Sequence, residues 1–199
     1  MIRFFDILFS LVGIIVLSPV LMIIYFLVII ETKGGGFYIQ KRVGRGGKIF
    51  KLYKFRSMSV GADKKGLITV GGSDPRMTRM GIFIRRFKLD ELPQLFNVLN
   101  GTMSLVGPRP EVQKYVELYT PAQYEVLSVK PGITDYASIE YVNENIVLGK
   151  ADNPEKIYID EILPAKIQLN MKYIQNRSLK EYFFIIFLTL WSIIKRKEV

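Results

Sequence analysis

The sequence predicts a mostly helical α+β protein with one small β-hairpin and an apolar helix at each end. Residues 7–30 form an uncharged apolar run, and residues 182–194 form a second, shorter one. Between them, residues 37–55 alternate apolar and polar side chains around a glycine-rich turn. Alternation is typical of strands, whereas long apolar runs are typical of helices in or on a membrane. A chain of 199 residues has room for one compact domain plus a membrane element.

The composition excludes several kinds of chemistry. The chain has neither cysteine nor histidine, which excludes disulfides and thiol catalysis and removes the commonest general base. Catalysis would depend on Asp, Glu, Lys, Arg, Tyr, Ser or Thr, and a metal would be a hard cation such as Mg²⁺. The net charge of +10 suits lipid headgroups, phosphates or nucleotides, although basic residues also orient membrane proteins without further function.

Residues 1–33 are predicted to form the membrane element. A helix over residues 7–30 would be roughly 36 Å long, enough to cross a hydrocarbon core of about 30 Å. Ser18-Pro19 interrupts it, because Pro19 cannot donate a hydrogen bond to the carbonyl of Ile15. The residues allow a kinked spanning helix or a re-entrant hairpin with both ends on one face, in which the Ser18 hydroxyl satisfies part of the freed backbone. The basic residues that follow, from Lys33 to Arg56, place that side in the cytoplasm.

After a flexible exit at residues 34–36, we expect two short strands over residues 37–40 and 48–55. Lys54 and Arg56 would share one face of the second strand, either solvated or binding phosphate. Residues 59–74 are rich in Gly, Asp, Ser and Lys and are predicted to form a mobile loop.

Two neighbouring acids, Asp90 and Glu91, are the main candidates for a reaction centre. They follow a short helix predicted over residues 82–88, and Pro93 suits the first turn of a helix that ends at Asn100-Gly101. Free N–H groups and the helix dipole at that end would favour ionised carboxylates. One acid could simply cap the helix, but two acids between leucines exceed what capping requires.

A rigid turn follows a short apolar segment at residues 104–106. Its sequence is Gly107-Pro108-Arg109-Pro110, and the two prolines would hold Arg109 in place as a fork for phosphate oxygens, or as a solvent-exposed arginine. A second turn is expected at residues 130–134.

The C-terminal third returns to helical patterns. Residues 158–176 are predicted to form an amphipathic helix interrupted at Pro164. Residues 182–194 are too few to span a bilayer; with Trp191 and the basic residues 195–197 they suit an interfacial helix, although a helix buried in the core is the alternative.

Five motifs together resemble the small monotopic phosphoglycosyl transferases, bacterial sugar transferases that begin glycan assembly on a polyprenyl phosphate. The motifs are Gln40-x-Arg42-x-Gly44, residues 50–58, Asp74-x-Arg76-x-Thr78, residues 90–94 and residues 103–110. Ser18-Pro19 also matches. Each piece is weak alone, but their order and spacing over residues 38–110 are specific.

The resemblance implies a re-entrant helix broken at Ser18-Pro19, followed by a cytosolic catalytic domain over residues 34–199 on the inner (plasma) membrane of a bacterium. It implies that Asp90 is the nucleophile and that Glu91, together with Asp90, helps to hold Mg²⁺. The remaining substrate-binding residues would be Lys54, Arg85, and Arg109 with Pro110.

The implied reaction moves a phosphosugar from a UDP-sugar to undecaprenyl or another polyprenyl phosphate and releases UMP through a covalent aspartyl intermediate. It would be the first membrane step of O-antigen, capsule, exopolysaccharide or glycoprotein synthesis, with the bilayer as a further partner and no nucleic acid. Residues 135–138 replace the Gly-Trp-Ala-Gln of many relatives, and Tyr182 replaces an aspartate, which affects the prediction of the sugar and not of the reaction. The sugar, the pathway and the formation of a homodimer are left open.

A non-catalytic membrane adaptor is the competing hypothesis. Such a protein would hold anionic lipid or nucleic acid on its basic face, which explains the charge and both apolar ends. It would not need two acids before Pro93, and its binding would be indifferent to Asp90→Asn.

Overall fold

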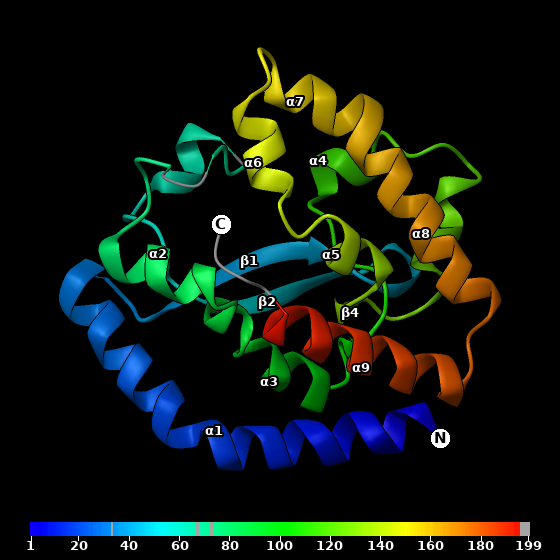
Figure 1. Ribbon diagram of the computed structural model, residues 1–199, viewed down its shortest axis with the longest axis horizontal. Helices are drawn as coiled ribbons and strands as arrows, with labels where there is room; N and C mark the ends of the chain where they lie inside the picture. Colours follow the sequence, from blue (N-terminus) through cyan, green and yellow to red (C-terminus); the bar gives the residue numbers. More distant parts are fainter. Residues whose placement is uncertain (33, 67, 72–73, 196–199) are drawn as a thin grey trace.

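The computed structural model describes residues 1–32, 34–66, 68–71 and 74–195, and shows one long helix laid along a mostly helical globular part (Figure 1). This confirms the α+β class with its small hairpin. Some residues used in the predictions lie outside the described part of the chain. They are Lys33, Arg196 and Lys197, whose charges were counted above, and loop positions 67, 72 and 73.

The helices are α1 (Ile2–Thr32), α2 (Arg79–Arg86), α3 (Gln94–Leu99), α4 (Gln113–Val116), α5 (Tyr136–Glu140), α6 (Glu144–Gly149), α7 (Pro154–Ile157), α8 (Leu163–Gln175) and α9 (Leu179–Ile194). The strands are β1 (Phe37–Val43), β2 (Ile49–Phe55), β3 (Ser104–Val106) and β4 (Gly132–Thr134). Short tight turns of helix are η1 (Arg45–Gly47), η2 (Ala62–Lys65), η3 (Leu89–Glu91), η4 (Gln123–Ser128) and the π-helical turn η5 (Tyr158–Ile162).

The segment predicted to enter the membrane forms one bent helix and not two separate ones. α1 is helical throughout with Pro19 inside it, and it bends near its middle (Figure 1). The Ser18 hydroxyl donates to the carbonyl of Ile15 at 2.7 Å, the acceptor that Pro19 leaves without an N–H donor. The predicted interruption is therefore a bend in a continuous helix, and the Ser18 hydroxyl satisfies the Ile15 carbonyl that Pro19 leaves without a donor.

Asp6 attaches the N-terminal end of α1 to the globular part. The side chain is buried, and its carboxylate accepts hydrogen bonds from the Ser104 hydroxyl and the Leu105 N–H, both at 2.9 Å, and from the Tyr182 hydroxyl at 3.0 Å. A buried carboxylate is costly unless it is hydrogen-bonded, so these bonds fix α1 against β3 and α9. Tyr182, which departs from the family pattern, thus has a structural role here.

Glu31 attaches the other end of the same helix. Its two carboxylate oxygens accept the N–H groups of Arg79 and Met80, each at 2.9 Å, at the start of α2. These N–H groups have no partner within their own helix, and the helix dipole favours a negative charge there. Both ends of α1 are therefore bonded to one globular part.

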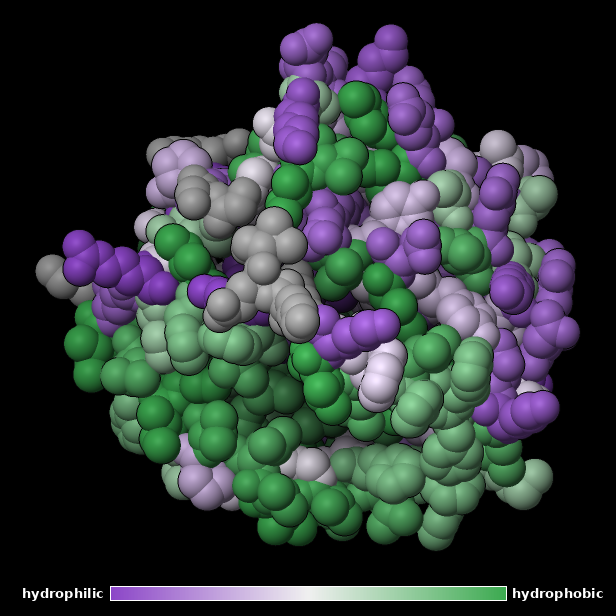
Figure 2. Space-filling view, in the orientation of Figure 1, coloured by the Kyte–Doolittle hydropathy of each residue, from purple (hydrophilic) through white to green (hydrophobic). Residues whose placement is uncertain are grey.

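The remaining face of α1 belongs to a large apolar surface. α1 is long and apolar enough to cross a membrane, yet only 17% of its most apolar window is buried. α9 lies beside it, because Phe183 makes ring contacts with Phe5 and Phe9 at 5.0 and 6.2 Å. Figure 2 shows apolar residues gathered on the side of α1 and α9 and hydrophilic residues on the opposite side. Surfaces of this extent mark contact with a membrane or a partner.

α9 combines the two alternatives that the sequence allowed for residues 182–194. Tyr182 and Ile185 are buried in the core, whereas Phe187 is 60% exposed and Ile194 is 80% exposed. One face thus packs against β3 and the start of α1, and the other extends the apolar surface.

The hairpin and α2 are brought together by a close approach of the backbone. β1 and β2 pair antiparallel, from Phe37 opposite Phe55 to Val43 opposite Ile49. The two predicted extended segments therefore form a paired β-hairpin around the predicted turn. A Cβ atom at Gly81 in α2 would lie 1.9 Å from the carbonyl oxygen of Ser57, so only glycine allows this packing. The contact sets α2 beside the end of β2.

A second close approach positions the proline turn. β3 and β4 pair in parallel, and a Cβ atom at Gly132 would lie 2.1 Å from the backbone nitrogen of Gly107. The segment predicted as a turn at residues 130–134 therefore contains β4. In the C-terminal third, helical backbone continues from α7 through the π-helical turn η5 into α8, and Pro164 is the second residue of α8. The predicted interruption at Pro164 is therefore a change from π-helical to α-helical geometry directly before the proline and not a break between two helices.

Candidate active site

A cavity with about 710 Å³ of empty space, partly open to solvent, lies between the hairpin, α2 and the segment after β2. We call it the basic cavity, because among the described residues it is lined by five cationic side chains and two carboxylates. They are Arg42, Lys54, Arg56, Arg76 and Arg85, with Asp63 and Asp90. Lys54 and Arg56 face the same space, as the strand pattern predicted. This excess of positive charge suits an anionic ligand.

Asp90 lies at the point where α2 gives way to α3. Lys88, just before it, adopts a left-handed conformation with φ of 57°, which is rare outside glycine and is typical of turns held in place by their surroundings. The turn buries Asp90, which is 5% exposed. Arg85 approaches it, with Nε 3.9 Å from Oδ2, and also donates to the Thr69 hydroxyl at 3.0 Å.

Glu91 is held by two cations from other elements. Arg109 donates to both of its carboxylate oxygens, at 3.0 Å to Oε2 and in a second short bond to Oε1. Lys54 Nζ lies 3.8 Å from Oε1. A bidentate Arg–carboxylate pair is strong and directional. Through these contacts Glu91, in the turn after α2, connects the proline turn by Arg109 and the hairpin by Lys54.

The two neighbouring acids differ in acidity. Burial raises the pKa of Asp90, and the charge of Glu91 raises it further, against the opposing effect of Lys54 and Arg85. Burial also acts to raise the pKa of Glu91, but Arg109 and Lys54 outweigh it and hold that pKa well below its usual range. At Asp90 the predicted effect of the helix end is therefore opposed, because burial next to an ionised neighbour disfavours the charged form of the carboxyl group.

Arg109 is fixed through its backbone as well as its side chain. Its N–H donates to Asp135 Oδ2 at 3.0 Å, and Asp135, which is completely buried, also caps α5. The carbonyl of Pro110 accepts from Arg42 at 3.0 Å. Asp135 belongs to the segment that departs from the family pattern, so this departure touches the site directly.

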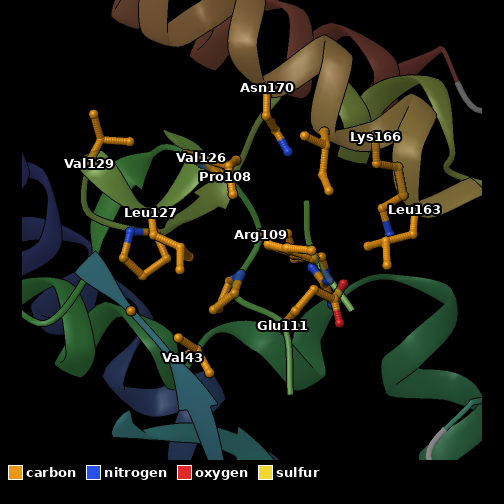
Figure 3. Close-up of a pocket in the computed structure, with 15 residues that line it drawn as sticks. Val43, Pro108, Arg109, Glu111, Val126, Leu127, Val129, Leu163, Lys166 and Asn170 are labelled. Atoms are coloured by element: carbon orange, nitrogen blue, oxygen red, sulfur yellow. The ribbon is translucent and has the colours of Figure 1, made fainter. Parts of the chain in front are cut away.

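A second cavity, with about 450 Å³ of empty space that is partly open to solvent, is lined by the proline turn. Arg109 and Pro110 line it together with Lys166 and Asn170 from α8 (Figure 3). The predicted site residues are therefore divided: Lys54, Arg85 and Asp90 line the basic cavity, and Arg109 and Pro110 line the other one. The Arg109–Glu91 pair links the two groups.

Sequence reasoning missed the network that supports this arrangement. Arg42 donates to Gln40 Oε1 at 2.8 and 3.0 Å and contacts Glu111, which accepts a hydrogen bond from the Tyr158 hydroxyl at 2.6 Å. Gln40 and Arg42 occupy alternate positions of β1 and so share a face, a signal that the sequence contained. Glu111 and Tyr158 are far apart in the chain, and no local pattern joins them. Ser18 and Pro19 line neither cavity.

The donor atoms at the site suit a magnesium ion shared with a ligand better than one held by protein alone. In the part of the chain that the structure describes, no three acidic side chains form a cluster that could hold a metal. Asp90 and Glu91 are neighbouring hard-oxygen donors, but both oxygens of Glu91 already face Arg109. Mg²⁺ is commonly bound by one or two carboxylates plus substrate phosphates and water, and these two residues fit such a site.

Comparison with known proteins gives consistent matches over nearly the whole chain. The model of a family described as bacterial sugar transferase matches residues 1–196. A UDP-N-acetylgalactosamine-undecaprenyl-phosphate N-acetylgalactosaminephosphotransferase of Aeromonas hydrophila is 36% identical over 195 residues, 96% of this chain and 43% of that protein. A UDP-glucose:undecaprenyl-phosphate glucose-1-phosphate transferase of Escherichia coli (strain K12) is 36% identical over 190 residues, 94% of this chain and 39% of that protein.

A shorter relative matches along its full length. The exopolysaccharide production protein PSS of Rhizobium leguminosarum bv. phaseoli is 36% identical over 202 residues, 98% of this chain and 95% of that protein. The chain thus spans less than half of the first two relatives and nearly all of the third.

The binding of inorganic pyrophosphate should weaken as the pH rises through about 7. Burial lowers the pKa of Lys54 to about 7, with Arg109 and Arg42 adding to the effect and Glu91 opposing it. Lys54 is cationic below that pH and neutral above it, so one attractive charge is lost between pH 6 and 8.5. We expect about a tenfold loss of affinity by calorimetry. Lys54→Arg stays charged and controls for the titration of pyrophosphate itself; equal pH profiles of the two proteins would contradict the prediction.

Proposed function

This chain belongs to the bacterial sugar transferase family, and on that basis we propose that it transfers a phosphosugar from a UDP-sugar to undecaprenyl phosphate and releases UMP. The names of two relatives contain both substrates. The observation that carries the proposal is the buried Asp90 carboxylate, which lies beside Arg85 in a cavity rich in positive charge. We place this reaction at the first membrane step of bacterial glycan synthesis.

Asp90 acts as the nucleophile in this proposal. One of its carboxylate oxygens attacks the phosphorus that carries the sugar, the bond from that phosphorus to the bridging oxygen breaks, and UMP leaves. An oxygen of undecaprenyl phosphate then attacks the same phosphorus, which restores the Asp90 carboxylate and yields the lipid diphosphosugar. Covalent catalysis divides a difficult reaction between two anions into two easier steps.

The cations around Asp90 reduce the electrostatic repulsion among three anions: the Asp90 carboxylate, the UDP-sugar and undecaprenyl phosphate. Lys54 and Arg85 face the phosphates and balance the charge that develops on them. Arg109 does not line the basic cavity; its side chain holds Glu91, the neighbour of Asp90. A basic adaptor would direct its cations outward, whereas here they line a cavity that ends at a buried acid.

Asp90 and Glu91 would hold Mg²⁺ together with the substrate phosphates. Bound there, the ion supplies neutralisation of phosphate charge. The Glu91–Arg109 pair keeps Glu91 ionised, which is the form that a metal requires.

We also propose that α1 is re-entrant and that the globular part rests on the cytoplasmic face of the bacterial plasma membrane. The support is that Asp6 and Glu31, at opposite ends of α1, bond to the same globular part. A spanning helix would have to break one of these attachments. The apolar surface of α1 and α9 would lie in the bilayer (Figure 2), which brings the basic cavity to the level of lipid phosphates.

Purified protein with Mg²⁺ and undecaprenyl phosphate should release UMP from at least one member of a panel of UDP-sugars. Asp90→Asn removes the nucleophile and should lower the rate at least about 10³-fold. Asp160→Asn, at an exposed acid away from both cavities, is the matched control and should keep the wild-type rate. Absence of UMP with every sugar would overturn the function, and an active Asp90→Asn variant would overturn the nucleophile.

Chelation by EDTA should abolish UMP release, and added Mg²⁺ should restore it. Because the ion would be shared with substrate, circular dichroism should show the fold unchanged by EDTA. Full activity in EDTA would refute the metal assignment.

Both ends of α1 should be accessible from the cytoplasmic side only. The chain has no cysteine, so single cysteines placed after Met1 and at Gly35 report the two ends without background. A membrane-impermeant maleimide should label both in inside-out vesicles and neither in intact spheroplasts, while Ile23→Cys in the apolar middle should stay unlabelled. Labelling of the first position in spheroplasts would show a spanning helix.

A further inference from the structure

Most cations of the basic cavity already have partners in the protein. Arg42 bonds to Gln40 and the carbonyl of Pro110, and Arg56 bonds to the carbonyls of Gly35 and Phe37. Arg76 bonds to Asp74 and to main-chain carbonyls of the loop. Lys54 and Arg85 are the two that approach the acids at the reaction centre. The phosphates of a nucleotide therefore have their natural place near these two residues.

Two other side chains that line the cavity, Tyr38 and Asp63, make no hydrogen bond within the described residues. Tyr38 is partly buried and lines the cavity from β1. Within the described residues its ring stacks on no other ring and its hydroxyl makes no hydrogen bond. Asp63 lines the cavity from η2, and its carboxylate has no hydrogen bond or ion pair in that same part of the chain.

Tyr38 and Asp63 face a common space next to the phosphate end. Burial raises the pKa of the Tyr38 hydroxyl, and the charge of Asp63 raises it further, which puts the carboxylate within electrostatic reach of the ring. In the hairpin, Tyr38 pairs directly with Lys54. The aromatic ring of Tyr38 thus lies opposite a cation of the reaction centre, and the Asp63 carboxylate lines the same cavity.

We propose that Tyr38 and Asp63 form the nucleoside end of the basic cavity, where the Tyr38 ring stacks on uracil and the Asp63 carboxylate accepts a hydrogen bond from the uracil N3–H. This inference rests on the proposed function, which supplies a uridine nucleotide as substrate. Aromatic side chains stack on bases without regard to their edges, so Tyr38 provides affinity. Asp63 provides selectivity, because cytosine carries a lone pair at N3 in place of the hydrogen and would be repelled by a carboxylate.

The test measures binding of UMP, CMP and inorganic pyrophosphate to the full-length protein in detergent with Mg²⁺, by calorimetry. Tyr38→Leu should weaken UMP binding about tenfold and leave pyrophosphate binding unchanged, whereas Tyr38→Phe should bind UMP like the wild type. Tyr53→Leu is the matched control, since Tyr53 lies on the same hairpin, pairs with Ile39 and does not line the cavity.

Selectivity is tested with Asp63→Asn. Wild-type protein should prefer UMP over CMP by about tenfold. An asparagine can present either its oxygen or its amide N–H, so the variant should bind the two nucleotides about equally. Asp152→Asn, an exposed acid outside the cavity, should keep the wild-type preference.

The outcomes separate this inference from the proposed function. Equal UMP affinity in Tyr38→Leu and wild type, or a UMP preference that survives Asp63→Asn, would overturn the nucleoside assignment even if sugar phosphate transfer is observed. A Tyr38→Leu variant altered only in its KM for undecaprenyl phosphate would assign this end to the lipid instead and would also overturn it. Absence of transfer from every UDP-sugar, with UMP binding intact, would overturn the function and leave the nucleoside end standing.

Discussion

The buried ion pair between Glu91 and Arg109 is the interaction on which the site depends. It joins the turn after α2 to the proline turn, and with Lys54 it draws the hairpin to the same point. It also makes two neighbouring acids different, because it stabilises the charge of Glu91 while Asp90 is left buried beside that charge. In a chain without histidine or cysteine, this difference in environment is what, in the proposed mechanism, lets one carboxylate serve as the reactive group and the next as a fixed anion.

Contacts of carboxylate side chains also fix the position of α1. Asp6 and Glu31 hold α1 at both ends, and the close approach of Gly81 to Ser57 sets α2 beside the end of β2. The basic cavity therefore has a fixed position relative to the apolar surface. In the proposed reaction, which moves a phosphosugar from a soluble nucleotide to a lipid phosphate, that relation matters as much as the chemistry at Asp90.

The sequence predicted those features that depend on local pattern. The alternation in residues 37–55 gave the hairpin, Pro93 and Asn100-Gly101 gave the ends of α3, and the paired prolines indicated a rigid Arg109. Features that depend on distant partners could not be predicted in this way. The parallel pairing of β3 with β4, the Asp6–Tyr182 bond and the raised pKa of Asp90 all result from burial against segments far away in the chain. The C-terminal departure at residues 135–138 was recognised, but its contact with Arg109 through Asp135 was visible only in three dimensions.

The central claim is that Asp90 becomes covalently linked to the phosphosugar. The most direct measurement is the intact mass of the protein after incubation with Mg²⁺ and a UDP-sugar that supports UMP release, in the absence of undecaprenyl phosphate. The account predicts a mass increase equal to one phosphosugar, located on Asp90 by peptide mapping, absent in Asp90→Asn and lost when undecaprenyl phosphate is added. Release of UMP only when both substrates are present, with no adduct at any time, would contradict it and would indicate direct transfer.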